Sequence, residues 1–159
     1  MNISVAVARN LGIGYKNELL FRISPDLKRF KEMTMGKTIV MGHSTFKSLP
    51  DQKPLPGRKN VVLSRDPKLV IAGAFVANSK EQAMEMVSGE EVFIIGGASI
   101  YELFLDDCAR AYITKVNSAP PADRFFPDLD KTPGWALASQ SETLHSDGYE
   151  FMYFEYARK

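Results

Sequence analysis

The 159-residue sequence has little of several features that would assign a protein to a special class. Its one cysteine, Cys108, excludes an internal disulfide and is typical of a protein of the reducing cytoplasm. Its two histidines, His43 and His145, lie far apart and have no second ligand at metal-binding spacing. We therefore expect a cytoplasmic protein without a metal ion.

Neither sign of charge dominates the sequence. Lys and Arg number 20 against 19 Asp and Glu, and the net charge of +1 gives no field that would attract nucleic acid or an anionic membrane. The longest apolar runs, such as 92–95, are far shorter than the roughly 20 residues that span a bilayer. The N-terminus has no basic region of the kind that begins a secretory signal. We expect no nucleic-acid or membrane partner.

The composition that remains is that of an ordinary globular protein. Hydrophobic residues make up 45% of the chain and charged residues 25%, and no repeat or flexible linker interrupts it. A chain of this length favours one domain over two. We therefore predict a single domain over residues 1–159.

Strand-like and helix-like segments alternate along the first two thirds of the chain, which predicts parallel βαβ units. The expected strands are 3–8, 38–41, 60–64 and 91–95, and the expected helices are 25–35, 44–49, 79–87 and 99–105. Three further strand-like segments follow at 110–116, 135–141 and 149–156, with a turn at 145–148. The predicted fold is α/β, with a mixed, mostly parallel central sheet flanked by helices and an antiparallel C-terminal edge.

One carboxylate of the expected helix 25–35 has an unusual setting. Ser24 is a suitable N-cap, and Pro25 suits the first helical position. At 100° per residue, Asp26 falls within the stripe that Leu27 and Phe30 share, away from the charged face. Asp26 either complements the helix dipole or forms a site for a cationic or amidine-like ring.

Three expected strands end in groups that suit an anion. The segments are the Gly-Gly turn after 92–95, the turn 41–45 and the pair Ser64-Arg65. Each alone is also typical of an ordinary turn or helix cap. Together they favour a nucleotide site, because nucleotides bind at the carboxyl edge of an open α/β sheet.

Two connecting segments have equally open interpretations. The connection 9–24 contains Gly12 and Gly14 and is either a mobile lid or a plain surface loop. The turn 54–59 presents Arg58, which is either a carboxylate clamp or a solvated cation.

The order and spacing of these motifs over essentially the whole chain resemble the dihydrofolate reductase family. The resemblance rests on Gly12-Ile13-Gly14, Pro25 to Lys31, Val40-Met41-Gly42, Pro54 to Asn60, Ile95-Gly96-Gly97 and Phe126-Pro127. It implies hydride transfer from NADPH to C6 of dihydrofolate and proton transfer to N5, giving tetrahydrofolate for one-carbon metabolism. It also implies antifolate inhibitors as ligands and a monomeric protein.

The resemblance assigns roles residue by residue. Asp26 would hold the pterin ring and promote protonation of N5, Thr114 would hydrogen-bond Asp26, and Arg58 would take the carboxylate of the glutamate tail. The remaining substrate contacts would be Val5, Ala6, Leu27, Phe30, Lys31, Leu49 and Ile95. The cofactor would contact Ala6, Ile13, Gly14, Gly42, His43, Ser44, Thr45, Leu63, Ser64, Arg65, Gly96, Gly97, Ala98, Ser99, Ile100 and Tyr101. By the same resemblance, Asp123 would steady the lid.

Two departures from the family pattern bear on these roles. Leu20-Phe21 stands where many members have Pro-Trp, so the catalytic position Phe21 has no indole N–H to hold a water. His43 replaces the usual Arg or Lys at the adenosine phosphate, so Arg65 should maintain the preference for NADPH.

Two other functions stay open at this point. A reductase of the same fold that acts on a ribosylated aminopyrimidine would need a ribose-phosphate site in place of Arg58, and it would not need Asp26. A nucleotide-binding module without catalysis would bind NADPH without turnover.

Overall fold

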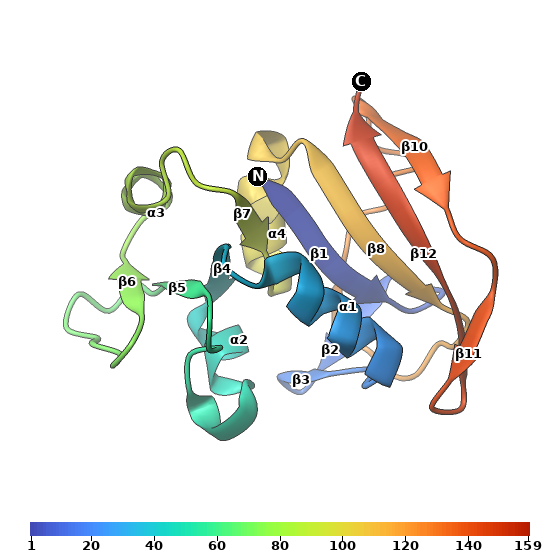
Figure 1. The fold of residues 1–159 in the computed structure, drawn as a ribbon, viewed down its shortest axis with the longest axis horizontal. Coiled ribbons are helices and arrows are strands. Elements are labelled where there is room, and N and C mark those ends of the chain that lie inside the picture. The colour runs from blue at the N-terminus through green and yellow to red at the C-terminus, as the bar shows by residue number, and fades with distance from the viewer.

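The computed structural model describes residues 1–159, and its main feature is a twisted sheet of nine strands (Figure 1). The strands follow the order β10-β12-β8-β1-β7-β4-β5-β6, and β11 pairs with β12. Their bounds are β1 (Asn2–Val7), β4 (Thr38–Gly42), β5 (Lys59–Leu63), β6 (Phe75–Ala77), β7 (Val92–Ile94), β8 (Arg110–Val116), β10 (Trp135–Gln140), β11 (Leu144–Ser146) and β12 (Tyr149–Arg158).

The sheet is mixed and mostly parallel, as predicted. Strands β8, β1, β7, β4, β5 and β6 run in one direction, and β12 is antiparallel to β8, β10 and β11. The sequence placed 110–116 in the antiparallel edge, and that prediction is wrong. A helix connects β7 to β8, and such a crossover returns the chain in its original direction beside β1.

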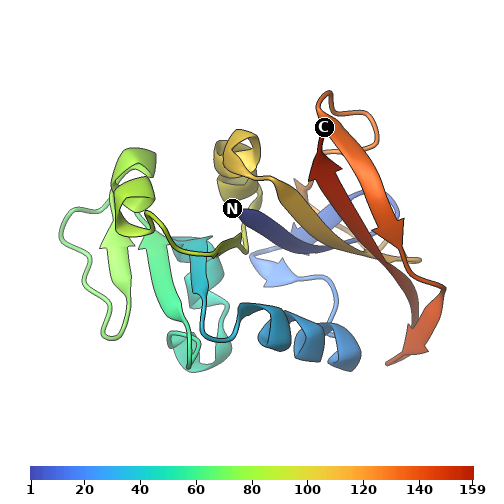
Figure 2. The same ribbon diagram turned by 45° about the horizontal axis from the view of Figure 1, so that its top comes forward.

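Helices cover both faces of the sheet, as Figure 2 shows. The helices α1 (Ser24–Thr34) and α2 (His43–Lys47) lie on one face, where Phe46 packs with Ile39 and Phe93. On the other face, α3 (Lys80–Met86) and α4 (Ala98–Phe104) close a larger core that contains Val61, Ile94 and Phe104. Short 3₁₀ helices cover Pro50–Gln52 and Leu105–Asp107. No helix is long and apolar enough to cross a membrane.

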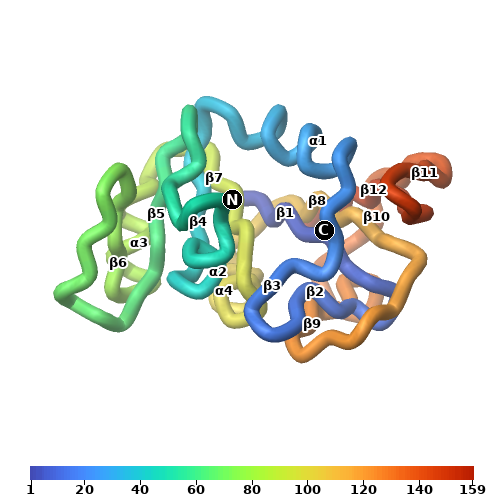
Figure 3. Tube along the Cα trace, turned by 90° about the horizontal axis from the view of Figure 1, so that it is seen from below, coloured from blue at the N-terminus to red at the C-terminus, as the bar shows by residue number.

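The connection 9–24 is not an unstructured loop. It forms β2 (Gly12–Tyr15) and β3 (Glu18–Leu19), which join β9 (Arg124–Phe125) in a second sheet (Figure 3). The Asp123 amide donates to the carbonyl of Gly14 at 2.9 Å, and the Asp123 carboxylate accepts from the Lys16 amide at 3.0 Å. The candidate lid is therefore tied to a distant segment of the chain.

The start of α1 differs from the predicted cap. Ile23 is the N-cap residue and makes no side-chain cap bond, so Ser24 is not the cap. The Ser24 amide donates to Asp147 Oδ2 at 2.8 Å, and its hydroxyl donates to Asp147 Oδ1 at 3.1 Å. The β11–β12 turn thus holds the end of α1 that carries Asp26. The N-cap of α3 is Ser79, whose hydroxyl accepts from the Gln82 amide at 3.0 Å.

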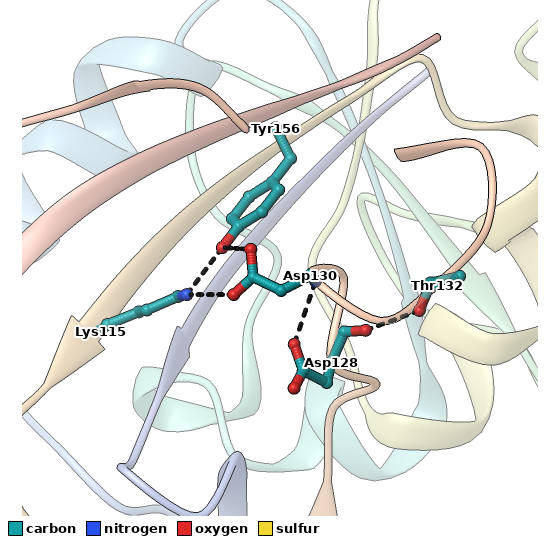
Figure 4. Close-up of polar contacts among 5 residues, drawn as sticks. All are labelled: Lys115, Asp128, Asp130, Thr132 and Tyr156. Carbon is teal, nitrogen blue, oxygen red and sulfur yellow. Dashed lines mark hydrogen bonds and ion pairs between the residues drawn. The ribbon is translucent and has the colours of Figure 1, made fainter. Parts of the chain in front are cut away.

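A ring of polar side chains ties the segment after β9 to the sheet (Figure 4). Lys115 Nζ donates to the Tyr156 hydroxyl at 2.7 Å and to Asp130 Oδ2 at 3.4 Å. The Tyr156 hydroxyl donates to Asp130 Oδ1 at 3.0 Å, and Asp128 accepts from the Asp130 amide at 3.0 Å. Since neighbouring strand residues face opposite ways and Thr114 bonds to α1, this ring lies on the face away from α1.

Replacing Tyr156 by phenylalanine should lower the free energy of unfolding by about 1 to 2 kcal/mol. The change keeps the buried ring and removes the hydroxyl that both Lys115 and Asp130 use. Equilibrium urea unfolding measures the effect. Tyr149→Phe is the matched control, because no hydrogen bond of the Tyr149 hydroxyl is present, and it should change stability by under about 0.5 kcal/mol. Equal losses in the two variants would show that the hydrogen bonds among Lys115, Asp130 and Tyr156 add no stability.

Candidate active site

A cavity of about 470 Å³ lies between α1, the β2–β3 segment and the carboxyl ends of β1 and β7. The chain segments that line it are far apart in sequence and meet only in the fold. Nineteen of the residues predicted for the site line it: Val5, Ala6, Ile13, Gly14, Phe21, Asp26, Leu27, Phe30, Lys31, Ser44, Thr45, Leu49, Arg58, Ile95, Gly96, Gly97, Ala98, Tyr101 and Thr114.

Asp26 is the chemically unusual group of this cavity. It projects from the first turn of α1 toward the sheet, where the Thr114 hydroxyl donates to Asp26 Oδ1 at 2.5 Å. Thr114 is buried on β8 and lies beside Ala6 of β1. Burial raises the pKa of Asp26 above its usual value, against the opposing effects of the Thr114 hydrogen bond and the Arg29 charge. A carboxyl group in this setting can hold a polar ring and take part in proton transfer.

The raised pKa makes ionised Asp26 a cost to folding. The cost is absent below the unfolded-state pKa, grows as pH rises, and is complete above the folded-state pKa. Asp26→Asn should therefore raise the melting temperature at neutral pH, and the gain should shrink as pH falls. Thermal unfolding of both proteins across pH 4 to 8 measures this. A gain that is constant over that range would contradict the burial of a charged carboxylate.

Apolar side chains and one cation make up the part of the cavity predicted to hold the substrate. Leu27 and Phe30 come from α1, Leu49 comes from the segment after α2, and Ile95 directly follows β7. Arg58 stands at one end, where its Nε donates to the Pro56 carbonyl at 3.0 Å and its Nη1 donates to the Thr34 hydroxyl at 3.2 Å. These two bonds orient the guanidinium and leave its Nη2 edge available to a carboxylate.

Glycine backbone forms the part of the cavity predicted to hold the cofactor. Gly96 has φ +127°, and a Cβ there would lie 3.4 Å from Thr45 Oγ1 and 3.5 Å from the Tyr101 hydroxyl. That hydroxyl is already engaged, since it donates to the Ser4 carbonyl at 2.8 Å. The Gly42 amide donates to the Gly96 carbonyl at 2.9 Å, which joins two strand ends. A side chain at 96 would fill the space beside Thr45 and Tyr101. The bare backbone of Gly96 and Gly97, here called the glycine cradle, therefore leaves room for a cofactor phosphate or ring.

Seven predicted cofactor residues lie along the same edge of the sheet and outside the cavity lining. Gly42 and Leu63 are paired at the ends of β4 and β5, and the Ser64 amide donates to the Ala77 carbonyl at 2.9 Å. These residues continue the predicted cofactor site along the edge of the sheet, away from Asp26, and so provide the length that a dinucleotide needs. The seven residues are Gly42, His43, Leu63, Ser64, Arg65, Ser99 and Ile100.

Comparisons with known proteins agree with this geometry. A family model described as dihydrofolate reductase matches residues 1–158. The chain belongs to the dihydrofolate reductase family. The relative from Neisseria meningitidis serogroup A is 39% identical over 160 residues, which cover 99% of this chain and 98% of the relative. The relative from Bacillus subtilis is 36% identical over 155 residues, which cover 94% of this chain and 90% of the relative.

A solved dihydrofolate reductase structure has the same fold. The enzyme from Enterococcus faecalis, complexed with NADP(H) and RAB-propyl, matches with a TM-score of 0.90 and 28% sequence identity. The match covers 99% of this chain and 95% of that one. The predicted fold class and the predicted enzyme class, an NADPH-dependent oxidoreductase, are confirmed.

Phe21, the departure from the dihydrofolate reductase pattern, is an anchor of the lid segment. Its side chain is buried and packs edge-to-face on Tyr149, with ring centroids 5.2 Å apart. It also belongs to a small core with Ile23, Val116 and Phe151. The ring thus fastens the lid segment to the β11–β12 turn while one side of it lines the cavity.

Three residues near the Asp26 carboxylate were missed by the sequence analysis. Arg29 was not among the predicted site residues, yet it lines the cavity with Tyr112, and its guanidinium lies over the ring of Tyr153. The spacing of three residues from Asp26 could have revealed Arg29, because residues i and i+3 are neighbours on a helix. Tyr112 lies two residues before Thr114 on β8, so strand alternation could have placed the two on one face, whereas only strand pairing brings Tyr153 to Thr114.

Proposed function

We propose that this protein reduces 7,8-dihydrofolate to 5,6,7,8-tetrahydrofolate with NADPH, and that Asp26 is its acidic catalytic residue. The observation that carries the proposal is the half-buried Asp26 carboxyl, held by buried Thr114 within an apolar cavity that ends at Arg58. Membership of the dihydrofolate reductase family supports the same reaction.

Asp26 is suited to one end of the substrate. A carboxylate accepts hydrogen bonds from the 2-amino group and from N3 of a pterin, and the Thr114 hydroxyl fixes the orientation of the carboxylate. Burial raises the pKa of Asp26, which makes its carboxyl group a better proton carrier and so promotes protonation of N5. Because Phe21 has no N–H, the water that carries this proton is held by other groups.

The remainder of the substrate follows the wall of the cavity. Leu27, Phe30 and Leu49 pack on the pterin and benzoyl rings, while Val5, Ala6 and Ile95 form the floor. The oriented Arg58 guanidinium binds the α-carboxylate of the glutamate tail, and Lys31 adds a second positive charge.

Arg58→Leu should raise the KM for dihydrofolate roughly tenfold, with a much smaller change in kcat. The guanidinium binds a part of the substrate that is remote from C6, so its loss weakens ground state and transition state alike. Steady-state kinetics with saturating NADPH measures both constants. Lys53→Leu is the matched control, because Lys53 is an exposed cation of the same loop outside the cavity lining. A fall in kcat at constant KM would contradict the assignment.

The carboxyl edge of the sheet provides the cofactor site. NADPH, when bound there, supplies the hydride that reduces C6. Ala6, Ile13 and Gly14 border the nicotinamide, and the glycine cradle at 96–97 with Thr45 borders the pyrophosphate. The adenosine phosphate lies among His43, Ser64 and Arg65. These residues position the reacting atoms and exclude water, which supplies much of the barrier reduction.

We place this activity in a single domain that acts as a monomer in the cytoplasm. The one thiol, Cys108, is buried, and burial raises its pKa to about 12, so it is unreactive. The named ligand RAB-propyl of the Enterococcus faecalis structure supports binding of antifolate inhibitors in the same cavity.

The loss of dihydronicotinamide absorbance on mixing protein, NADPH and dihydrofolate tests the proposal. We expect rapid oxidation that depends on dihydrofolate, with NADH and substrate-free mixtures as controls. Binding of NADPH without turnover would instead favour a nucleotide-binding module or a reductase for an aminopyrimidine.

A further inference from the structure

The Arg29 guanidinium is held between α1 and the sheet close to Asp26. Its central carbon lies 4.1 Å from the ring centroid of Tyr153 and 5.9 Å from that of Tyr112. Tyr112 precedes Thr114 by two residues on β8, and Tyr153 is the direct partner of Thr114 on β12. The side chains of Tyr112, Thr114 and Tyr153 therefore share one face of the sheet, and Arg29 lies over the patch from which Thr114 donates to Asp26.

Arg29 holds this place without an ion pair. None of the six ion pairs of the protein includes it. Its contact with the two rings is a cation–π interaction, which fixes the position of a guanidinium without cancelling its charge. The carboxylate of Asp26 consequently remains free to bind a ring, while a positive charge stays near it.

The other charged groups around Asp26 are paired or lie on other parts of the cavity. On the sheet, Glu155 of β12 is paired with Arg110 at 3.3 Å, and the Tyr153 phenol has a pKa raised by burial and by the Asp26 charge. Tyr112 likewise has a raised pKa, from burial and from Glu155. The lid and the far end of the cavity contribute Glu18, Arg22, Arg124, Lys31 and Arg58. Of all these groups, only Arg29 acts by its charge to lower the pKa of Asp26.

We propose that Arg29 is a positioning residue for the reaction proposed above: Tyr112 and Tyr153 hold its charge where it favours the ionised form of Asp26 without occupying the carboxylate. Burial alone would keep the carboxyl group protonated over a wider pH range, and such a group binds the 2-amino and N3 donors of a pterin less well. A direct ion pair between Arg29 and Asp26 would favour the ionised carboxylate too strongly. The guanidinium would then compete with the pterin for the carboxylate and disfavour the protonated form that promotes protonation of N5. Tyr112 and Tyr153, here called the aromatic clamp, keep the Arg29 charge at a position between these two extremes, near Asp26 but not paired with it. This inference rests on the proposed function.

The titration of the Asp26 carboxyl carbon, followed by NMR in protein labelled with ¹³C at aspartate Cγ, tests the inference directly. Asp26→Asn assigns the signal. Arg29→Met should move the titration midpoint to higher pH, and Arg29→Lys should bring it back toward the original midpoint because the charge is restored. Lys28→Met is the matched control: it removes the same charge from the exposed side of the same helix and should leave the midpoint unchanged.

The outcomes separate the inference from the proposed function. An unmoved midpoint in Arg29→Met, or equal shifts in Arg29→Met and Lys28→Met, would overturn the role of Arg29. Tyr153→Leu keeps the charge and removes the nearer ring, so a partial shift supports the clamp and no shift contradicts it. The pH profile of kcat/KM for dihydrofolate should move with the NMR midpoint. If the midpoint shifts while the original protein reduces no dihydrofolate, the electrostatic effect stands and the proposed function fails.

Discussion

Asp26→Asn should lower kcat/KM for dihydrofolate at pH 7 by at least roughly 100-fold, the lower range for removal of an acid–base group. The amide has nearly the same shape and can still accept the Thr114 hydrogen bond, so the cavity should keep its form. It carries neither a charge for the pterin nor a proton for N5. Steady-state oxidation of NADPH at several dihydrofolate concentrations measures the loss.

Two comparisons make this result specific. Glu18→Gln removes a carboxylate from the lid side of the same cavity and should cost far less. The Asp26→Asn protein should also be more stable than the original at neutral pH, so a loss of activity cannot be attributed to unfolding. A loss of only a few-fold would reject Asp26 as the key acid.

Arg65→Met should lower the preference for NADPH over NADH by roughly 10- to 100-fold, as expected for the loss of hydrogen bonds between a cation and a phosphate. Arg65 is exposed two residues beyond the end of β5, three strands away from β1 in the sheet. With His43 as its only predicted basic neighbour, Arg65 should supply most of the phosphate recognition. The ratio of kcat/KM values for the two cofactors gives the preference.

The loss should come from NADPH alone, because NADH has no 2′-phosphate. Lys68→Met is the matched control, since it removes an exposed cation from the same loop. Equal kcat/KM values for NADH and NADPH in the original protein would contradict the phosphate site altogether. A similar loss for both cofactors in Arg65→Met would show that Arg65 holds the segment rather than the phosphate.

Four of the parallel strands, β1, β4, β5 and β7, and the glycine-lined edge could be predicted because local sequence determines them, whereas β6 was missed and β8 was misplaced. Strands β4, β5 and β7 are short runs with buried residues on both faces, whereas β1 alternates buried and half-buried residues. Asp26 was also accessible to the sequence, because helical spacing puts it beside Leu27 and Phe30. The predicted site residues that line the cavity come mainly from these segments.

The missed features depend on contacts between distant segments. Strands β3 and β9 contain two exposed residues each, too few for a periodic pattern, and only their pairing with β2 defines them. Ser24 satisfied every local preference for an N-cap, but Asp147, 123 residues away, binds its hydroxyl instead. Arg29 is of a residue type that usually faces solvent, and only its contacts with Tyr112 of β8 and Tyr153 of β12 hold it beside Asp26.

The transfer of deuterium from NADPH labelled at the transferable C4 position tests the central claim most directly. We expect the label at C6 of tetrahydrofolate, in an amount equal to the NADPH oxidised, and almost none of this product from the Asp26→Asn protein over the same time. Oxidation of NADPH without label at C6, or equal labelling by the two proteins, would contradict a dihydrofolate reductase that depends on Asp26.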